Sequence, residues 1–512
     1  MRFDVIIKGG DVVDGSGAQR TGLDVGIVNG RIAVVDRLDG VTAPTVVDAR
    51  DLIVAPGFID VHVHSELARL GGIDQFAGVL DGVTTEFMSA DGFGWAPLTP
   101  ERHREVRDYL QVFYGNPTIG WDWTTVKDYL SIFRGRIPNN LVPQAPHLAI
   151  KVAAMGWEPG PPSPGQMAAM RRHLVEWLGV GSVGMAAGLE YQPGALSHSS
   201  ELIDLCRVVA DADGVYAPHQ RGYWSQLKFG CAETFEIARS SRVKVHISHL
   251  AIDETAHHLI EEAKLDVDLS FDMYPYPAAC TQLLMMLPEG AQAGGYTASM
   301  SRLASRAERQ RLRVVTAQRI RERGEITLSY VQDGQHLEGC TLGDLARESH
   351  QFPVDYLWDL LLEHAGRVLA IYHWPPSIET EEIIRRTLKH PLYIGSTDGI
   401  YMGTKPHRRG FGTFARIVGD HVRSGLLTLE QAVHKVTGLP AQRFSLRDRG
   451  LIKVGRAADI TIFDAATLGD QTTWGAGRVS PSGVCYVLVN GEFTVRNGRT
   501  TGSLPGTIVG RS

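Results

Sequence analysis

The feature that most constrains the fold is an alternation, along the middle of the chain, between short apolar runs and longer amphipathic helical stretches. This pattern is typical of repeated βα units, in which helices cover both faces of a parallel sheet. Eight candidate strands can be counted, over Phe58–Val63, Val83–Met88, His147–Ala153, Ser182–Ala186, Val215–Pro218, Val243–Ser248, Val267–Phe271 and Leu392–Gly395. Eight strands favour a closed (β/α)8 barrel of the TIM-like kind, in the α/β class, over an open sheet.

Both ends of the chain have a different pattern, with short strands separated by Gly and Asp turns. These strands are predicted over Val5–Ile7, Asp24–Val28, Arg31–Val35, Thr45–Val47, Asp459–Phe463 and Val484–Val489. We therefore expect residues 1–55 and 430–512 to form one small composite β-sandwich domain, whose part up to about residue 450 is helical and packs on the barrel. Residues 56–429 are expected to form the barrel itself.

One interval does not follow the alternation. From about residue 288 to 348 the chain is rich in Arg, Glu, Gln and Ala, with helical runs over Ser301–Arg323. This interval is too long for an ordinary βα loop, so it is predicted to be an insertion. Two roles fit it equally, a lid over the active site and a surface excursion without a catalytic role.

Composition and charge disfavour several classes of protein. The 512 residues carry a formal net charge of −6 without a long run of like charges, unlike a nucleic-acid track or a polybasic membrane patch. The N-terminus enters a strand pattern at once, unlike a signal peptide, and no apolar stretch approaches the roughly 20 residues that cross a bilayer. We expect a cytoplasmic protein that acts on a small molecule and has no nucleic-acid or membrane partner. A homo-oligomer is compatible with the sequence.

The most informative segment is Pro56–His64, an apolar strand that ends in His62 and His64. Residues two apart on a strand point to the same face, so both imidazoles project into the mouth of the barrel at the C-terminal end of the strand. Barrel enzymes place their chemistry at this end. The Pro-Gly-Phe-Ile-Asp lead makes the motif more specific than a bare HxH. The two histidines are therefore predicted to bind one metal ion.

Further side chains of the metal-binding kind follow later strands. His219 follows the fifth predicted strand, His249 the sixth and Asp398 the eighth. Any one of them alone would more often be a structural residue. Together with the histidine pair they can converge on one or two divalent ions, and nitrogen and oxygen ligands of this kind suit zinc best.

These motifs resemble the amidohydrolase superfamily and, within it, the D-aminoacylase family (N-acyl-D-amino-acid deacylases). The resemblance spans nearly the whole chain. Its most specific marks are Pro56–His64, Gly82–Thr85, Gly188–Gly194, Ile247–Leu250, Asp272–Tyr276 and Gly412–Phe414, with Arg449–Ile452, Gly455–Asp459 and Val487–Gly491 near the C-terminus. It implies a β-sandwich made from both termini, a zinc-bearing barrel and an insertion near the site.

The resemblance also implies a role for each residue of the site. His62 and His64 match the first-strand metal ligands. His219 and His249 match the fifth- and sixth-strand ligands, and Asp398 matches the eighth-strand acid/base, which is also a ligand. Bound zinc lowers the pKa of its water from about 15.7 towards about 7 and polarises the amide carbonyl. The metal-bound hydroxide would attack a linear amide, while Asp398 takes the proton and delivers it to the leaving nitrogen.

The first departure from the family pattern concerns the metal. Asp91 occupies the place of a metal-bridging cysteine that family members usually carry after the second strand. A carboxylate can bind or bridge zinc, and it can equally cap the following turn. Both a one-metal and a two-metal site therefore stay open.

The second departure concerns the substrate. Ala251 replaces a family lysine that helps to hold the substrate carboxylate, whereas Arg409 retains an arginine that can grip a carboxylate as a bidentate fork. Arg221 is a further candidate for this contact. Tyr191 and Tyr274 match family tyrosines near the substrate.

The leading hypothesis is a zinc-dependent amidohydrolase that cleaves a linear C–N amide, such as an N-acyl-D-amino acid. A cyclic amide of the hydantoinase or imidase kind is the alternative, because loss of one cation by replacement with Ala251 weakens the case for a carboxylate on the substrate. A third hypothesis is a non-catalytic binding protein that has kept the barrel.

Overall fold

The computed structural model describes residues 2–511 and shows a closed barrel of parallel strands. The strands run in chain order around it: β7 (Phe58–Asp60) with β8 (Val63–His64), β9 (Val83–Phe87), β10 (Asn140–Val142) with β11 (Ala145–Pro146), β12 (Gly184–Gly188), β13 (Val215–His219), β14 (Lys244–Ile247), β15 (Leu269–Met273), and β19 (Tyr393–Gly395) with β20 (Gly399–Ile400). Parallel pairing of β20 with β8 joins the eighth strand to the first. The predicted (β/α)8 fold is therefore confirmed.

The seam between the first and eighth strands is held by side chains as well as by the backbone. The backbone N–H of Asp398 donates to the carbonyl oxygen of His62 (2.7 Å). Asp60, which is 1% exposed, accepts from the backbone N–H of Thr397 (3.0 Å) and from its hydroxyl (2.5 Å). These contacts fix the two strand ends that carry predicted metal ligands.

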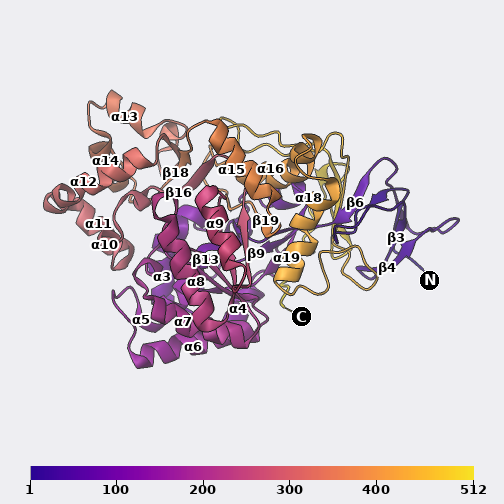
Figure 1. Cartoon of the computed structure of the whole chain (residues 1–512), viewed down its shortest axis with the longest axis horizontal. Coiled ribbons are helices and arrows are strands. Elements are labelled where there is room, and N and C mark those ends of the chain that lie inside the picture. The colour runs from indigo at the N-terminus through magenta and orange to yellow at the C-terminus, as the bar shows by residue number, and fades with distance from the viewer. Residues whose placement is uncertain (1, 512) are drawn as a thin grey trace.

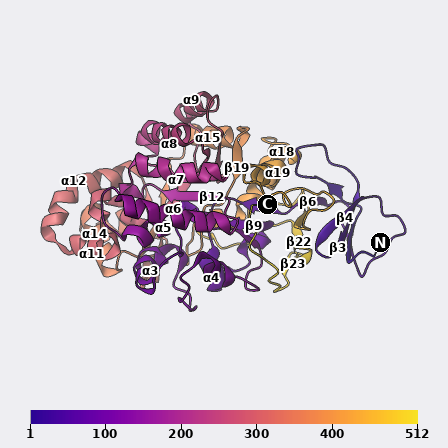
Figure 2. The same ribbon diagram turned by 90° about the horizontal axis from the view of Figure 1, so that it is seen from below.

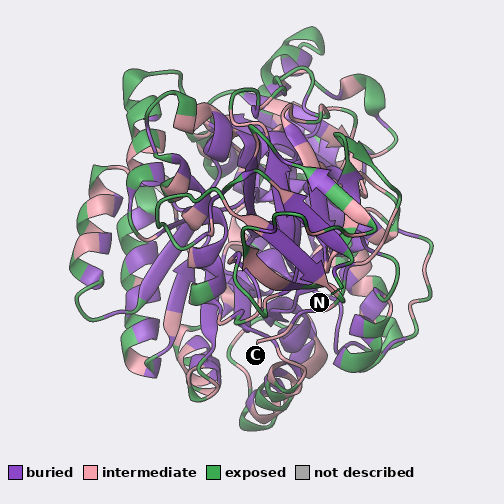
Figure 3. Cartoon of the chain, turned by 90° about the vertical axis from the view of Figure 1, so that its right-hand side faces the viewer, coloured by how far each residue is buried: buried purple, intermediate pink, exposed green. Residues whose placement is uncertain are grey.

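Helices cover the outside of the barrel. Amphipathic helices such as α7 (Ser199–Asp211), α9 (Glu254–Ala263) and α15 (Ile378–Lys389) turn apolar side chains towards the strands and polar ones towards solvent. Figure 3 shows the result, with buried strands inside and exposed outer faces on the helices. No helix among residues 2–511 is long and apolar enough to cross a membrane.

The prediction of the third strand was wrong. Residues His147–Met155 form helix α5, and the third strand precedes it as β10 and β11, with Pro143 in the short gap between them. Most residues of α5 are buried. A short, nearly all-apolar run lacks the periodicity that separates a buried helix from a buried strand. The other seven predicted strands are present, with shifts of a few residues at their ends.

The strands predicted at both chain ends build two packed sheets. One contains β1 (Val5–Lys8), β3 (Asp24–Val28), β4 (Arg31–Asp36) and β5 (Thr45–Asp48). The other combines N-terminal with C-terminal strands: β2 (Asp11–Val12), β6 (Ile53–Pro56), β21 (Ile460–Phe463), β22 (Val484–Val489), β23 (Glu492–Arg496) and β24 (Arg499–Thr500). Apolar side chains of both sheets share one core, among them Ile7, Val25, Ile460 and Leu488. The sandwich is thus composite, as predicted.

Gly57 marks the passage from the sandwich strand β6 into the barrel. A Cβ at this position would lie 2.2 Å from side-chain atoms of Thr84, so only glycine permits this approach of the first barrel strand to the second. The Pro-Gly element of the sequence motif therefore has a packing role, which places the following histidines at the barrel mouth.

The inserted segment is longer than predicted and contains a sheet of its own. Between β15 and β19 the chain forms β16 (Ala278–Gln282), α10 (Glu289–Gln292), α11 (Gly295–Ala304), α12 (Arg306–Glu322), β17 (Ile326–Val331), α13 (Leu342–Glu348), α14 (Pro353–Glu363) and β18 (Val368–His373). The three strands pair antiparallel in the order β16-β18-β17. Its helices lie at one end of the elongated molecule, opposite the sandwich strands β3 and β4 (Figures 1 and 2).

Candidate metal centre and active-site pocket

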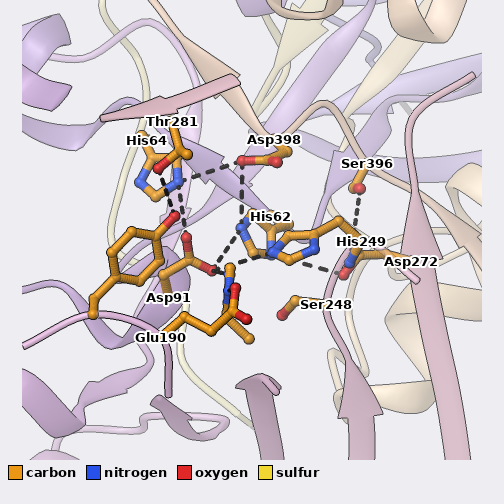
Figure 4. Close-up of polar contacts among 12 residues, drawn as sticks. His62, His64, Asp91, Glu190, Ser248, His249, Asp272, Thr281, Ser396 and Asp398 are labelled. Carbon is orange, nitrogen blue, oxygen red and sulfur yellow. Dashed lines mark hydrogen bonds and ion pairs between the residues drawn. The ribbon is translucent and has the colours of Figure 1, made fainter. Parts of the chain in front are cut away.

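All six predicted metal ligands come together at the C-terminal ends of the barrel strands. His62 and His64 lie at the end of the first strand, and Asp91 follows β9. The remaining three residues lie at or just after the ends of later strands, namely His219, His249 and Asp398. Figure 4 shows the side chains of five of them, His62, His64, Asp91, His249 and Asp398, pointing into one space.

Asp91 occupies the middle of this cluster. Its Oδ1 lies 3.4 Å from Nε2 of His62, 3.5 Å from Nδ1 of His219 and 3.6 Å from Nε2 of His249. Its Oδ2 lies 3.5 Å from Nε2 of His64. Of the two roles that the sequence left open for Asp91, the geometry favours the metal ligand, because no hydrogen bond from its carboxylate to the following turn is found among the described residues.

Asp398 approaches the cluster from the opposite side. Its Oδ1 lies 3.4 Å from Nε2 of His64 and 3.6 Å from Nε2 of His62. Potential ligand atoms fall into three overlapping sets, in each of which they lie within 4.8 Å of one another; one set holds His62, His249 and Asp398. Two of the sets contain Asp91, so this carboxylate can serve two neighbouring ions.

The donor atoms of the cluster fit a metal ion. Among the described residues, Nε2 of His62, Oδ1 of Asp91 and Nδ1 of His219 are buried and make no hydrogen bond. Buried polar atoms without a partner are costly unless something else binds them. Imidazole nitrogens and carboxylate oxygens in this number are the ligands of zinc sites.

The electrostatics of the cluster also favour a bound cation. Burial by itself lowers the pKa of His62, but the carboxylates of Asp91, Asp272 and Asp398 outweigh it and raise that pKa to about 10. At His219, burial likewise lowers the pKa, but the carboxylates of Asp91 and Glu190 outweigh it and raise the pKa to about 9. The acidic groups thus stabilise positive charge at the point where the ligand atoms meet.

Three of the six predicted ligand residues have left-handed backbone conformations. The φ angles are 56° at Asp91, 38° at His249 and 47° at Asp398. Such angles are uncommon for residues other than glycine and occur at sites where the surrounding structure holds them in place. Each of these residues follows a barrel strand, and the turn directs its side chain back over the barrel mouth.

Side chains behind the cluster orient the histidines, and no sequence pattern indicated this role for them. The hydroxyl of Tyr114 lies 3.1 Å from Nδ1 of His64, and Oε2 of Glu190 lies 3.0 Å from Nε2 of His219. In both cases the contact leaves the other ring nitrogen facing the cluster. Partners of this kind set the tautomer and the orientation of a metal-binding imidazole.

Asp272 ties the first, sixth and eighth strands together beneath the cluster. Its Oδ1 accepts from the backbone N–H of His249 (3.0 Å) and from the hydroxyl of Ser396 (2.6 Å). Its Oδ2 lies 2.9 Å from Nε2 of His246 and 3.8 Å from Nδ1 of His62. Asp272 is the first residue of the Asp-Met-Tyr-Pro motif noted in the sequence, but the motif alone does not indicate which groups its carboxylate contacts.

A cavity opens beside the ligand cluster, and three of the four predicted substrate-binding residues line it. These are Tyr191, Tyr274 and Arg409. The hydroxyl of Tyr191 shares a hydrogen bond with Thr281 of the inserted segment (2.8 Å). Much of the remaining wall is apolar, with Phe113, Leu227, Met273, Met285, Trp374 and Ile383. The inserted segment therefore supplies part of the pocket, which favours the lid role over a surface excursion.

Arg409 connects the pocket to Asp398. It is fully buried, with Nη1 2.8 Å from Oδ2 of Asp398 and Cζ 4.4 Å from the centroid of the Tyr274 ring. Its Nη2 donates to the carbonyl oxygen of Cys280 (3.1 Å). Its Nε has no hydrogen-bond partner among the described residues. One buried edge of this pocket-lining guanidinium is thus without a hydrogen bond.

Arg221 does not belong to the pocket, which corrects the prediction. Its Nε donates to Glu233 (3.0 Å), and its two terminal nitrogens donate to the carbonyl oxygens of Ala195 and Ser197. Every nitrogen of the guanidinium is therefore used within the fold. Its position two residues after His219 suggested a site role, but its side chain contacts Glu233 of α8 (Leu227–Ser241) and the loop after β12 instead of lining the pocket.

Comparisons with known proteins agree with this geometry. The model of the amidohydrolase family matches residues 45–495. D-aminoacylase from Alcaligenes xylosoxydans xylosoxydans is 30% identical, over 100% of this chain and 98% of that protein. N-acyl-D-glutamate deacylase from the same organism is 31% identical, over 96% of this chain and 93% of that protein.

A solved structure is similar over its whole length. N-acyl-D-glutamate deacylase from Bordetella bronchiseptica, complexed with zinc and a phosphonate inhibitor that mimics the tetrahedral intermediate, superposes with a TM-score of 0.85. The two sequences are 27% identical, and the match covers 100% of both chains. With the family model matched over most of its length, the chain belongs to the amidohydrolase family, and its full-length relatives include the D-aminoacylases.

Proposed function

We propose that this protein is a zinc-dependent hydrolase of linear amides of the N-acyl-D-amino-acid kind. The observation that carries the proposal is the set of buried, unpartnered ligand atoms around Asp91, which faces a pocket containing an acid/base residue and an arginine. Hydrolysis of a linear amide is also the reaction that the names of the full-length relatives describe.

In this proposal the metal is held by the six residues of the cluster, with Asp91 between the histidines. Bound zinc supplies Lewis-acid activation of water and of the amide carbonyl. The surrounding residues provide the fixed geometry for that activation. Tyr114, Glu190 and Asp272 orient the imidazoles, and the pocket walls limit access of bulk water.

Asp398 moves the proton. Burial raises the pKa of its carboxyl, but Arg409, His64 and His62 lower it overall, so the group is ionised and can accept a proton at neutral pH. Its Oδ1 faces the ligand cluster, where the attacking water would lie, while Oδ2 is held by Arg409. The same carboxyl can then deliver the proton to the leaving nitrogen, without which an amine leaves poorly.

Arg409 and Tyr274 are proposed to orient the substrate. Arg409 lines the pocket next to the Tyr274 ring, and its buried Nε makes no hydrogen bond among the described residues. A guanidinium binds a carboxylate in a directed, charge-assisted way. A substrate carboxylate placed there would set the amide beside Asp398. The pocket therefore retains one cation for this contact despite Ala251.

The central test measures metal and activity together. The purified protein should contain about one to two equivalents of zinc, hydrolyse N-acetyl-D-amino acids and lose activity with a chelator. His62→Ala should lose both metal and activity, whereas His258→Ala, at an exposed histidine of α9, should retain both. Full activity of metal-free protein would overturn the mechanism.

Hydantoins and cyclic imides in the same assay test the alternative substrate class. Faster hydrolysis of the cyclic amides would replace the linear-amide proposal while leaving the metal site intact. The non-catalytic hypothesis loses its basis, because the complete ligand set converges and the relatives are named as enzymes. The cytoplasmic location, the homo-oligomer and the exact domain limits stay predictions.

A further inference from the structure

A second cavity continues the active-site pocket outward. The two cavities share Glu190, Tyr223, Ala279, Met285, Arg323 and Trp374 in their walls. The outer cavity is formed largely by the inserted segment and includes the last turn of α12. A substrate bound at the metal cluster can therefore extend past these shared residues towards α12.

Arg323 is the cation at this junction. It is partly buried and lines both cavities. Its guanidinium makes no hydrogen bond or ion pair with any described residue, and its Cζ lies 6.0 Å from the centroid of the Tyr372 ring. The other arginine of the active-site pocket, Arg409, forms an ion pair with Asp398 and is the one proposed above to hold the carboxylate next to the amide. Arg323 is thus the arginine of this pocket whose guanidinium makes no hydrogen bond or ion pair among the described residues.

The acidic groups near Arg323 are already engaged. Glu190 interacts electrostatically with Arg323, but its carboxylate oxygens contact Nε2 of His219 (3.0 Å) and the backbone N–H of Gly222 (3.2 Å). Glu289 pairs with Arg319 (2.7 Å), and Glu322 accepts from Gln318 of the preceding turn (2.7 Å). Asp253, on the far wall of the active-site pocket, caps α9 through Ala256 (2.7 Å).

We propose that Arg323 binds a carboxylate of the substrate at the end remote from the scissile amide. The inference rests on the proposed amide hydrolysis and narrows its substrates to those with a second, distal carboxylate. A guanidinium beside apolar walls such as Met285 and Trp374 is less screened than one in water, which strengthens a charge-assisted pair. Arg323 is then the residue that distinguishes acidic from neutral substrates.

The test compares substrates that differ only in this charge. One arm uses N-acetyl-D-glutamate against N-acetyl-D-glutamine, with the carboxylate on the amine side. The other uses N-succinyl-D-leucine against its terminal amide, with the carboxylate on the acyl side. Wild type should prefer the charged member of one pair by about 10- to 100-fold in kcat/KM. The arm that shows the preference identifies which half of the substrate faces α12.

Variants assign the preference to Arg323. Arg323→Gln should reduce the ratio to within about threefold of one, mainly through KM of the charged substrate, and Arg323→Lys should restore part of it. Arg306→Gln, at an exposed arginine at the opposite end of α12, should keep the wild-type ratio. A wild-type ratio near one in both arms, or an unchanged ratio in Arg323→Gln, overturns the inference.

A binding measurement separates this inference from the proposed function. Glutarate contains no amide and can be titrated into the zinc-loaded protein by calorimetry. It should bind wild type at least about tenfold more tightly than Arg323→Gln. Tighter binding without hydrolysis of any amide would leave the carboxylate site standing and reject the proposed reaction. Equal glutarate binding by both proteins, together with hydrolysis of neutral substrates, would reject the carboxylate site at Arg323 and leave the proposed amide hydrolysis standing.

Discussion

Arg409 forms an ion pair with the carboxylate oxygen of Asp398 that points away from the candidate metal ligands. Nη1 of the arginine lies 2.8 Å from Oδ2 of the aspartate, while Oδ1 of the same carboxylate faces the imidazoles of His62 and His64. The proposed proton carrier is therefore positioned from both sides, by a fully buried cation and by the ligand cluster.

Replacing Arg409 should change the pH dependence of activity. The guanidinium lowers the pKa of Asp398, so Arg409→Met should raise that pKa, and the active, ionised form should be lost at a higher pH on acidification. The acidic limb of the kcat/KM profile should move up by about one unit or more. Arg409→Lys should move it less. A profile unchanged in Arg409→Met would contradict the assigned role.

Asp398→Asn should lose activity beyond what any loss of metal explains. General acid–base catalysis contributes about 10²- to 10⁴-fold, and the amide cannot carry the proton. Zinc content, measured by mass spectrometry on the same samples, separates the two effects. A variant that keeps its zinc and retains more than about a tenth of the wild-type kcat would show that another group moves the proton.

Asp91 should control metal content. Because it lies between the four histidines, Asp91→Ala should remove most bound zinc and most activity. Asp91→Cys introduces the thiolate expected at this position from the family resemblance, and a thiolate is a strong zinc ligand. The φ angle of 56° favours Asp over Cys there, so this variant should bind zinc at some cost in stability. Zinc retention by Asp91→Ala would rule out the ligand role.

Glu190 should affect zinc affinity without touching the metal. Loss of its contact with Nε2 of His219 in Glu190→Ala should weaken zinc binding by about 10- to 100-fold, as measured by competition with a chromophoric chelator. Glu289→Ala removes an acid of the neighbouring cavity that does not contact His219, and it serves as the control. Equal zinc affinity in both variants would remove Glu190 from the site.

The buried Glu201 should stabilise the fold in a defined pH range. It accepts from Lys151 (2.7 Å) and lies 3.0 Å from Nε2 of His147. Burial raises its pKa, but these partners lower it from 4.5 to about 2. A carboxyl with a lowered folded-state pKa stabilises the protein above its unfolded pKa, and this contribution is lost as the pH falls from 4.5 towards 2.

In urea unfolding at pH 7, Glu201→Gln should cost roughly 3 kcal/mol, because it leaves a buried cation without its partner. The difference from wild type should shrink at pH 3. Glu363→Gln, at an exposed glutamate of α14, should change stability by less than about 0.5 kcal/mol. A cost that stays constant across this pH range would show that packing at Glu201, rather than its charge, stabilises the protein.

The barrel and the convergence of the candidate ligand residues could be predicted because local signals specified them. The strand periodicity and the Pro-Gly lead placed His62 and His64, and single residues at later strand ends completed the set. Helix α5 could not be separated from a strand, because nearly every residue in it is buried. Strand β17 was missed in the insertion because its pairing partner, β18, lies far along the chain.

The groups behind the ligands were missed for a different reason. Tyr114 lies 50 residues from His64, and Glu190 lies 29 residues from His219. No spacing rule connects such pairs, since only the folded barrel brings them together. Arg221 shows the opposite error: its nearness in sequence to His219 suggested a role in the site, but its guanidinium is bonded within the fold and does not line the pocket.

The pairing of the first strand with the eighth determines when, during folding, the metal site can form. Thr397 and Asp60, which meet there, lie 337 residues apart. Contacts over such a separation form late in folding, since a long loop must close before they stabilise anything. During synthesis, His62 and His64 leave the ribosome early but remain unaligned until Asp398 follows. Zinc uptake should therefore report that the barrel has closed, and a nascent chain that ends before β19 should bind the metal weakly or not at all.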